Sequence, residues 1–441
     1  MIDLHQAAKS AVSVPIGEAA FPVPFETGLE YAAPARGPWN IVHVGMLLPE
    51  SRQIFVCAEG CLRGVVLTAA EMGAMDRFST IAVQENNLLE GDMEQLIIDG
   101  TSRILSELPR LPRAVLLFTS CVHHFVGCDL HYVFQKLREK FPAVDFTDCY
   151  MNPIMRKSKT PPDAKMRQQL YSFLRPAEQD GGVSLLGTLT PLDEENDLFR
   201  LLSGSGRPFR AITSCKTYDG YLELSKSSFG LTINPAAALA GETLEKRLGM
   251  RHLHLPLSYD FDEIAANLSR FCEALDIPAP DFAPWRKRAE EALRAAAEAL
   301  SGVPVAIDYT ATTRPLGLAK LLLEHGFAVE SVYADSFSAP EKPAFDWLRE
   351  NAPGLTLHPT VHPVMGMLPR DEADARDGKL LAIGQKAAYF TGTGYFLNLI
   401  EGDGHYGFDG IARLAEELAE AAREEKDVPS IIQVKGWGCC G

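Results

Sequence analysis

From about residue 38 onward, the chain repeats one pattern: a short apolar run, a turn, and a segment whose apolar positions have helical spacing. The first series contains the apolar runs 52–57 and 113–119, each followed by a helical pattern, over 62–75 and 129–141. Short apolar runs bounded by turn residues are typical of buried parallel strands. Strands that alternate with crossover helices predict parallel sheets with helices on both faces.

Two further series follow, the second from Gly181 and the third from Val303. In the second series we expect a strand over 209–214 and a helix over 218–229, and long amphipathic helices over 261–275 and 283–300 precede the third. A chain of 441 residues is too long for one core. We therefore predict an α/β fold of three Rossmann-like domains with parallel sheets. The predicted parts are an N-terminal arm at 1–37 and domains at 38–180, 181–300 and 301–441, the last ending in a helix over 410–425 and a Cys-Cys tail.

Charge and hydropathy exclude several classes of function. The formal net charge of −16 argues against a nucleic-acid binder, which needs a basic stripe, and against docking on anionic lipid. No run of eighteen apolar residues predicts a transmembrane helix, and the first residues lack the basic and apolar regions of a secretory signal. We expect a cytoplasmic protein, in which the nine cysteines do not form a disulfide framework.

Cysteines follow the ends of two predicted strands in the first domain. Cys57 and Cys61 are one helical turn apart, so both sulfurs can face one point if a helix begins near Glu59. A helix N-terminus favours thiolates and an anionic cluster. Cys121 follows the second strand in a similar way. One free cysteine is more often a core residue than a ligand, but three cysteines at two strand ends favour an iron–sulfur cluster.

Cys215 has the corresponding place in the second domain, where a predicted strand turns into a helix. Ligands of doubly wound sheets bind outside the carboxyl ends of the strands, but a small residue that closes a packed loop explains Cys215 equally well. His405 opens the loop before the last helix, where a cap or surface residue is more common than a metal ligand. His123, beside Cys121, either tunes a cluster or pairs with backbone carbonyls. The remaining cysteines are interpreted as structural or tail residues: Cys128, Cys149, Cys272, Cys439 and Cys440.

Several cofactor motifs are absent from the sequence. It has no G-x4-G-K-[ST] motif for ATP, no G-x-G-x-x-G motif after a strand for a nicotinamide cofactor, and no His/Glu zinc motif. The cysteines are therefore the feature on which a cofactor prediction rests.

The cysteine segments resemble component 1 of nitrogenase and the nitrogenase-like reductases. Cys57-Ala-Glu-Gly-Cys61 is similar to the family's His-Gly-Pro-x-Gly-Cys segment, with Cys61 at its cluster cysteine. Thr119-Ser-Cys121, followed by Gly127, resembles the family's strand-end cysteine before Ile-Gly-Asp.

Further patches extend this resemblance to about residues 38–425. Residues 85–91 resemble a family segment that precedes a helix, and 214–230 resemble the stretch in which the catalytic α-type subunit ligates the large active-site cluster. Residues 405–410, His-Tyr-Gly-Phe-Asp-Gly, resemble the family's Tyr-His-Gly-Phe-Asp-Gly loop.

The sequence departs from the family pattern at two ligands. No cysteine precedes Cys57, which therefore takes the place of an upstream family cysteine. The histidine that completes ligation of the active-site cluster in nitrogenase has no counterpart, because Leu397 and Asn398 stand there. We therefore do not expect reduction of dinitrogen.

The resemblance implies an oxidoreductase that works in a heterotetramer with a paralogous component 1 subunit. A homodimeric ATP-hydrolysing iron–sulfur reductase would pass single electrons to an interface cluster, 4Fe-4S or larger, ligated by Cys57, Cys61 and Cys121. Cys215 would hold a second, larger iron–sulfur cofactor.

Among the branches of the family, the chain is most similar to methylthio-alkane reductase subunits, which cleave carbon–sulfur bonds for sulfur supply. One alternative is a tetrapyrrole reductase acting on protochlorophyllide or a nickel porphinoid precursor, which needs no equivalent of Cys215. Another alternative is a non-catalytic scaffold for cofactor assembly.

Overall fold

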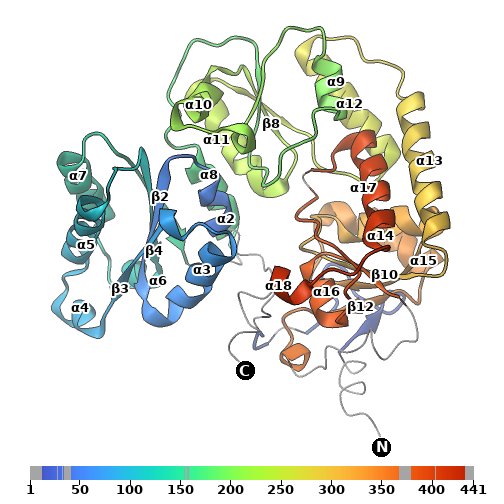
Figure 1. The fold of residues 1–441 in the computed structure, drawn as a ribbon, viewed down its shortest axis with the longest axis horizontal. Helices are drawn as coiled ribbons and strands as arrows, with labels where there is room; N and C mark the ends of the chain where they lie inside the picture. Colours follow the sequence, from blue (N-terminus) through green and yellow to red (C-terminus); the bar gives the residue numbers. More distant parts are fainter. Residues whose placement is uncertain are drawn as a thin grey trace, which may run out of the picture. The chain divides into compact units, whose positions relative to one another are not determined.

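The computed structural model describes residues 12–26, 28–31, 33, 41–152, 154–155, 158–366, 379–402 and 404–432 (Figure 1). The chain divides into two compact units, and neither unit is one continuous stretch of sequence. Unit 1 comprises 1–37, 190–205 and 255–441, and unit 2 comprises 38–189 and 206–254. In the described part of the chain, the strands form three sheets that are parallel except at one edge, which confirms the predicted α/β class.

The first sheet of unit 2 is fully parallel and carries the cysteine segments. Its strand order is β3 (Phe78–Val83), β2 (Ser51–Ala58), β4 (Ala114–Ser120) and β5 (Asp145–Met151). Side chains alternate between the two faces, so Phe55 and Cys57 point into one apolar core while Ile54 and Val56 point into the other.

Helices cover both faces of this sheet (Figure 1). The core that contains Cys57 is closed by α2 (Ile41–Met46), α3 (Glu59–Glu71) and α8 (Pro162–Leu170). The opposite core is closed by α5 (Met93–Glu107) and α7 (Leu130–Lys140). Both cores consist of aliphatic and aromatic side chains from alternate strand positions, which explains why the strands read as continuous apolar runs.

The second sheet of unit 2 is also fully parallel, and the bounds of two of its elements differ from the sequence prediction. Its order is β7 (Phe209–Ala211), β6 (Val183–Leu185), β8 (Phe229–Thr232) and β9 (Arg251–His254), all parallel.

The helix predicted over 218–229 is wrong in extent. Helix α10 (Tyr218–Leu222) is followed by a 3-10 turn, and Phe229–Thr232 is a strand between β6 and β9. Gly230 allows this placement, because a Cβ there would lie 3.0 Å from the side chains of Leu186 and Met250. The predicted strand over 209–214 is likewise shorter and ends at Ala211. Helix α11 (Ala238–Leu248) packs on β8 and β9.

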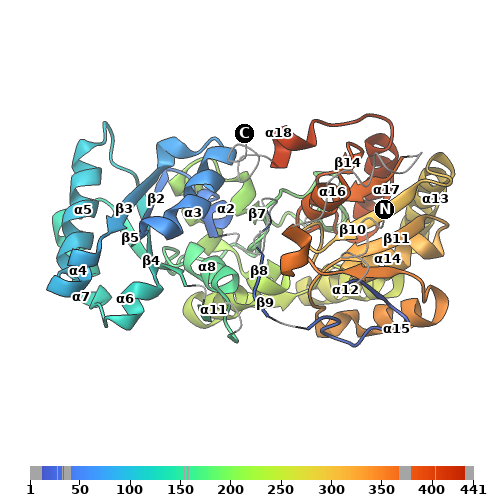
Figure 2. The same ribbon diagram turned by 90° about the horizontal axis from the view of Figure 1, so that it is seen from below.

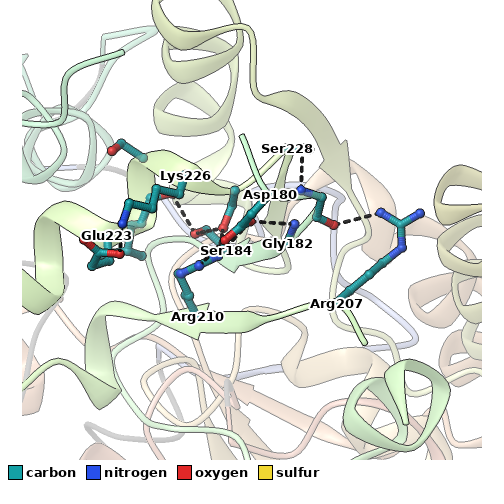
Figure 3. Close-up of polar contacts among 12 residues, drawn as sticks. Asp180, Gly182, Ser184, Arg207, Arg210, Glu223, Lys226 and Ser228 are labelled. Carbon is teal, nitrogen blue, oxygen red and sulfur yellow. Dashed lines mark hydrogen bonds and ion pairs between the residues drawn. The ribbon is translucent and has the colours of Figure 1, made fainter. Parts of the chain in front are cut away.

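A polar network closes the amino-terminal edge of this second sheet (Figure 3). Arg210 pairs with both carboxylate oxygens of Asp180, and its Nη1 also donates to Ser227 Oγ at 3.1 Å. Ser184 Oγ donates to Ser227 Oγ at 2.9 Å, and Arg207 Nη1 donates to the carbonyl of Gly181 at 2.8 Å. The polar side chains at the amino-terminal edge thus pair with one another and with the backbone. Cys215 lies beyond the opposite, carboxyl-terminal edge of the same sheet.

Replacing Asp180 with asparagine is expected to lower the free energy of unfolding by about 1 kcal/mol near neutral pH, because the charge-assisted bonds to Arg210 are lost. Those bonds hold the pKa of Asp180 below its usual range. The stabilisation is therefore present at neutral pH and is lost as pH falls through the lowered pKa. Urea denaturation at neutral and acidic pH measures the difference.

The matched control for this change is Asp219→Asn. Asp219 also pairs with an arginine, Arg113, but its side chain is 74% exposed. Exposed ion pairs contribute less, about 0.5 kcal/mol. Equal effects of the two substitutions would contradict the role given to the Asp180–Arg210 pair.

Unit 1 is built on a six-stranded sheet with helices on both faces (Figure 2). Its strand order is β1 (Val14–Pro15), β12 (Thr356–His358), β11 (Ala328–Tyr333), β10 (Pro304–Asp308), β13 (Leu381–Ile383) and β14 (Phe396–Leu397). Its helices are α9 (Asp197–Leu202), α12 (Phe261–Leu275), α13 (Ala283–Ala299), α14 (Pro315–Glu324), α15 (Lys342–Asn351), α16 (Gln385–Thr391), α17 (Gly407–Ala421) and α18 (Val428–Ile432). Across all the residues described, no helix has both the length and the apolar character that a bilayer span requires.

The described residues of the N-terminal arm pack on unit 1 of the same chain. Strand β1 pairs antiparallel with β12, with Val14 opposite Leu357. The amide of Tyr31 donates to the carbonyl of Val361 at 2.6 Å, and the hydroxyls of Tyr31 and Tyr389 are 3.1 Å apart. The arm therefore covers the edge strand β12, whose backbone groups would otherwise be free to pair with another chain.

Candidate functional site

Strands β2 and β4 place Cys57, Cys61 and Cys121 at the carboxyl-terminal edge of the first sheet. Val56 of β2 pairs with Thr119 of β4 in the parallel register. Cys57 comes one residue after Val56, and Cys121 comes two residues after Thr119. Neighbouring strands are about 4.8 Å apart. Helix α3 begins at Glu59, the start that would let the sulfurs of Cys57 and Cys61 face one point, and Cys61 is in its first turn.

The three thiols differ in exposure but lie near one another. Cys57 is fully buried, Cys61 is exposed and Cys121 is intermediate, and none of them is in a disulfide. Burial raises the pKa of Cys57 to about 12, and the thiols of Cys61 and Cys121 raise it further by charge repulsion. The thiolate form of Cys57 is therefore disfavoured unless a positive charge, such as that of a metal ion, lies beside it.

The first turn of α3 is open. Ala58, at the N-cap, makes no side-chain hydrogen bond to the first amides of the helix, so these N–H groups keep their donor capacity. A Cβ added at Gly60 or Gly64 would meet no heavy atom within 4 Å. An anionic group at this end of the helix is favoured by the helix dipole and meets no steric obstacle.

The donor set fits an iron–sulfur cluster better than a single metal ion. Throughout the described residues, no three His, Cys, Asp or Glu side chains are arranged around one metal position. In an iron–sulfur cluster the cysteines bind different iron atoms, so wider spacing is suitable, and four ligands are usual. Cys57, Cys61 and Cys121 are three free thiols that could serve as such ligands.

His123 lies within α6 (Cys121–Phe125), and Cys128 follows this helix. His123 is buried, and its Nδ1 lies 3.1 Å from the amide nitrogen and 3.3 Å from the carbonyl oxygen of Ser120. Burial lowers the pKa of His123, so its ring stays neutral. The Cys128 thiol is hydrogen-bonded to Glu94, and burial raises its pKa to about 12. The Cys128 thiol therefore has a protein partner, Glu94.

Exposed apolar side chains flank the cysteines. We call them the apolar rim: Leu88 and Leu89 in α4 (Glu85–Glu90), and Phe125 and Val126 at the end of α6. Leu89 is 79% exposed and Phe125 is 70% exposed. Both helices follow strands of the first sheet and begin at the same edge as α3. Large exposed apolar groups at one edge are typical of a protein-binding surface.

Cys215 lies at the carboxyl-terminal end of β7 in the second sheet, after a 3-10 turn over Ile212–Ser214. Its thiol donates to the carbonyl of Ala211 at 3.4 Å, and burial raises its pKa. Cys215 packs against the apolar core that contains Cys57. The charges that act on Cys57 come from Cys61 and Cys121 and do not include Cys215. The structure therefore groups three of the four predicted residues and leaves the fourth at another sheet.

The loop at 405–410 has a structural role in unit 1. His405 is buried rather than at the surface, and its Nε2 lies 3.0 Å from Glu417 Oε2. Asp197, from α9, accepts the amides of Phe408 and Asp409 at the start of α17. Asp197 was missed by the sequence analysis, because its partners are more than 200 residues away along the chain. Cys439 and Cys440 lie outside the described residues.

Comparisons with known proteins agree with this geometry. A family model described as nitrogenase component 1 type oxidoreductase matches residues 54–423. The solved structure "Nitrogenase Cp1 at pH 6.5" is similar, with a TM-score of 0.64, 16% identity, and coverage of 90% of this chain and 94% of that chain. "Nitrogenase Cp1 at pH 5" gives a TM-score of 0.58 and 13% identity, with 96% of each chain covered. A search of curated proteins gave no significant match.

At these identities the solved structures establish the fold alone, whereas the family model covers most of the sequence. The chain belongs to the nitrogenase component 1 type oxidoreductases.

Proposed function

We propose that the chain is the iron–sulfur subunit of a cytoplasmic, nitrogenase-like two-component reductase. The observation that carries this proposal is the set of three free cysteines at adjacent strand ends. One of them is buried in an apolar core, one is intermediate, and one is exposed in the open first turn of α3. Members of the family bind iron–sulfur clusters, and the chemistry of these three thiols suits such a group.

In this proposal the cluster lies at an interface with a paralogous subunit. Cys57, Cys61 and Cys121 supply three ligands, so a fourth must come from elsewhere, and the exposed Cys61 lies where a second chain can reach. The apolar rim gives that chain a surface to cover. The family works as a heterotetramer together with an iron protein. We propose the same assembly here, with a homodimeric ATP-hydrolysing iron–sulfur reductase as electron donor.

Each cysteine has a distinct share in holding the cluster. Cys57 fixes it against the apolar core, where a low dielectric raises the energetic importance of every nearby hydrogen bond and charge. Cys61 presents it to the partner. Because Cys57 stands in for an upstream cysteine of the family, this cluster is bound in a rearranged site.

We further propose that Cys215 anchors a second, larger iron–sulfur cofactor at which the substrate is reduced. The thiol is half-buried, next to an apolar core that also contains Tyr171 and Tyr221. It follows the carboxyl end of β7, the edge of a parallel sheet at which ligands bind. The substrate that we propose is a methylthio-alkane, whose carbon–sulfur bond is cleaved reductively.

The assay that tests this function uses the complex purified without oxygen. It is supplied with its reductase, ATP and a volatile methylthio compound, and methanethiol and hydrocarbon are measured in the headspace. Release of both that depends on ATP and is absent in Cys215→Ala supports the proposal. Turnover of a tetrapyrrole that persists in Cys215→Ala would instead identify a tetrapyrrole reductase, and cluster transfer to another apoprotein without turnover would identify a scaffold.

A further inference from the structure

The segment 190–205, which we call the strap, connects β6 to β7 but belongs to unit 1. It contains α9, which buries Leu198 and Leu202, and it also makes polar contacts with unit 1. Asn196 Nδ2 donates to the carbonyl of Tyr406 at 2.7 Å, and Asp197 Oδ2 accepts the amides of Phe408 at 2.6 Å and Asp409 at 3.1 Å. The strap is thus held at the N-terminus of α17, where the helix dipole favours a negative charge.

Two buried carboxyl groups belong to this attachment, and in each of them one oxygen has no hydrogen-bond partner among the described residues. Asp197 is fully buried; its Oδ1 is that oxygen, and its nearest ionic partner is Arg200 Nη1 at 3.9 Å. Asp409 is 3% exposed; its Oδ1 pairs with Arg200 at 3.3 Å and with Arg288 at 3.2 Å, whereas its Oδ2 has no partner in the described chain. Gly407 allows the close approach, because a Cβ there would lie 2.4 Å from Asp197 Oδ2.

We propose that Asp197 and Asp409 share one proton and that the pair is an acid-held latch, which fastens the strap to α17. In the shared state a proton on Asp197 Oδ1 donates to Asp409 Oδ2, so that each of these two oxygens gains the hydrogen bond that it lacks. Asp197 Oδ2 continues to accept the two amides. Two carboxyl groups buried side by side share a proton more readily than they both ionise.

The surroundings of the pair decide the direction of its pH dependence. Burial is the main cause that raises the pKa of Asp197, to about 6, and the negative charge of Asp409 raises it further. Burial also raises the pKa of Asp409, while arginines oppose that change. Other charged or titratable groups face the pair from α9, α13, α17 and the adjoining loops: Arg200, Arg288, Arg413, Asp193 and Tyr406. Tyr406 is in turn influenced by the charges of Arg270 and Glu263.

The direction of the pH dependence follows from the linkage between proton binding and opening of the strap. A carboxyl group whose pKa is higher in the closed state binds its proton more tightly there than in the open state. The stabilisation from the shared proton is therefore complete below the ordinary carboxyl pKa and is lost as pH rises through about 6. The latch holds in weak acid and loosens toward alkaline pH.

Hydrogen exchange of the full chain, corrected for intrinsic rates, tests the latch. Between about pH 5 and pH 8, the opening constant of the amides in 197–202 is expected to rise about tenfold in the native protein, given the raised pKa. In Asp197→Asn the side chain is neutral at every pH and can donate to Asp409, so the opening constant is expected to stay constant. Asp262→Asn, at a 91% exposed carboxylate, is the matched control and is expected to behave like the native protein.

The two variants separate the shared proton from a merely structural contact. A native protein without pH-dependent opening, or an Asp197→Asn variant that keeps the native pH dependence, would overturn the proposal. If Asp197→Asn does not fold, Asp409→Asn replaces it. Removing the neighbouring charge is expected to move the rise in opening to lower pH, and an unchanged midpoint would also exclude the shared proton.

Discussion

Replacement of Cys121 with alanine is expected to remove most of the iron from the protein purified without oxygen, and Cys61→Ala is expected to do the same. Three thiols at one sheet edge have to hold the proposed cluster together with a ligand from the partner, and loss of one leaves an iron atom without its protein ligand. Iron analysis and low-temperature EPR measure the loss, expected to be at least tenfold in the signal of the interface cluster.

The matched control for the cysteine variants is Cys272→Ala. Cys272 is buried in α12 and belongs to unit 1, whereas the proposed ligands belong to unit 2, so its removal is expected to leave iron content unchanged. Unchanged iron in both Cys61→Ala and Cys121→Ala would exclude the cluster at this edge. Loss of the signal in Cys57→Ala as well would show that the substituted cysteine is a true ligand in the rearranged site.

Replacement of Gly410 with alanine is expected to lower the free energy of unfolding by about 4 kcal/mol or to prevent folding, one of the largest effects of a single methyl group. A Cβ at this position would lie 2.1 Å from the carbonyl carbon of His405 and 2.4 Å from its oxygen. The obstacle is backbone, which cannot rotate away, so the start of α17 would have to move. Urea denaturation followed by circular dichroism measures the loss.

Gly354→Ala is the matched control in the same unit. Nothing lies within 4 Å of a Cβ at Gly354, so the change is expected to alter stability by less than about 0.5 kcal/mol. A Gly410→Ala protein as stable as Gly354→Ala would show that the start of α17 can move at little cost. The last glycine of the 405–410 loop would then have a role other than packing.

Local patterns in the sequence predicted the elements that local interactions determine. The amphipathic spacing of 261–275 predicts α12 to the residue, and Asp260 caps it by accepting the amides of Asp262 and Glu263. The helix predicted over 218–229 was too long, because the mostly apolar segment Phe229–Thr232 at its end is compatible with a strand as well as with a helix. Pairing with β6 and β9 selects the strand, and those partners lie far along the chain.

In the candidate site, too, features that depend on local sequence could be predicted and those that depend on distant residues could not. Strand-end positions for Cys57 and Cys121 follow from the apolar runs before them, whereas the helical pattern was predicted over 62–75 and the helix begins earlier, at Glu59. The role of Asp197 could not be predicted, because it depends on a helix start more than 200 residues away. The only local sign is Asn196, a capping residue that accepts the amide of Leu198.

The division of the chain into units has a consequence for its synthesis. Unit 2, with all four candidate cysteines, needs nothing beyond residue 254, so its fold can form while the ribosome is still producing the rest. Unit 1 needs residues from near the start of the chain, from the strap and from beyond 255. Val14 must wait for Leu357 before β1 can pair. The first described residues to be made are thus among the last to find their places, whereas the unit that contains the candidate cysteines has all of its own residues by position 254.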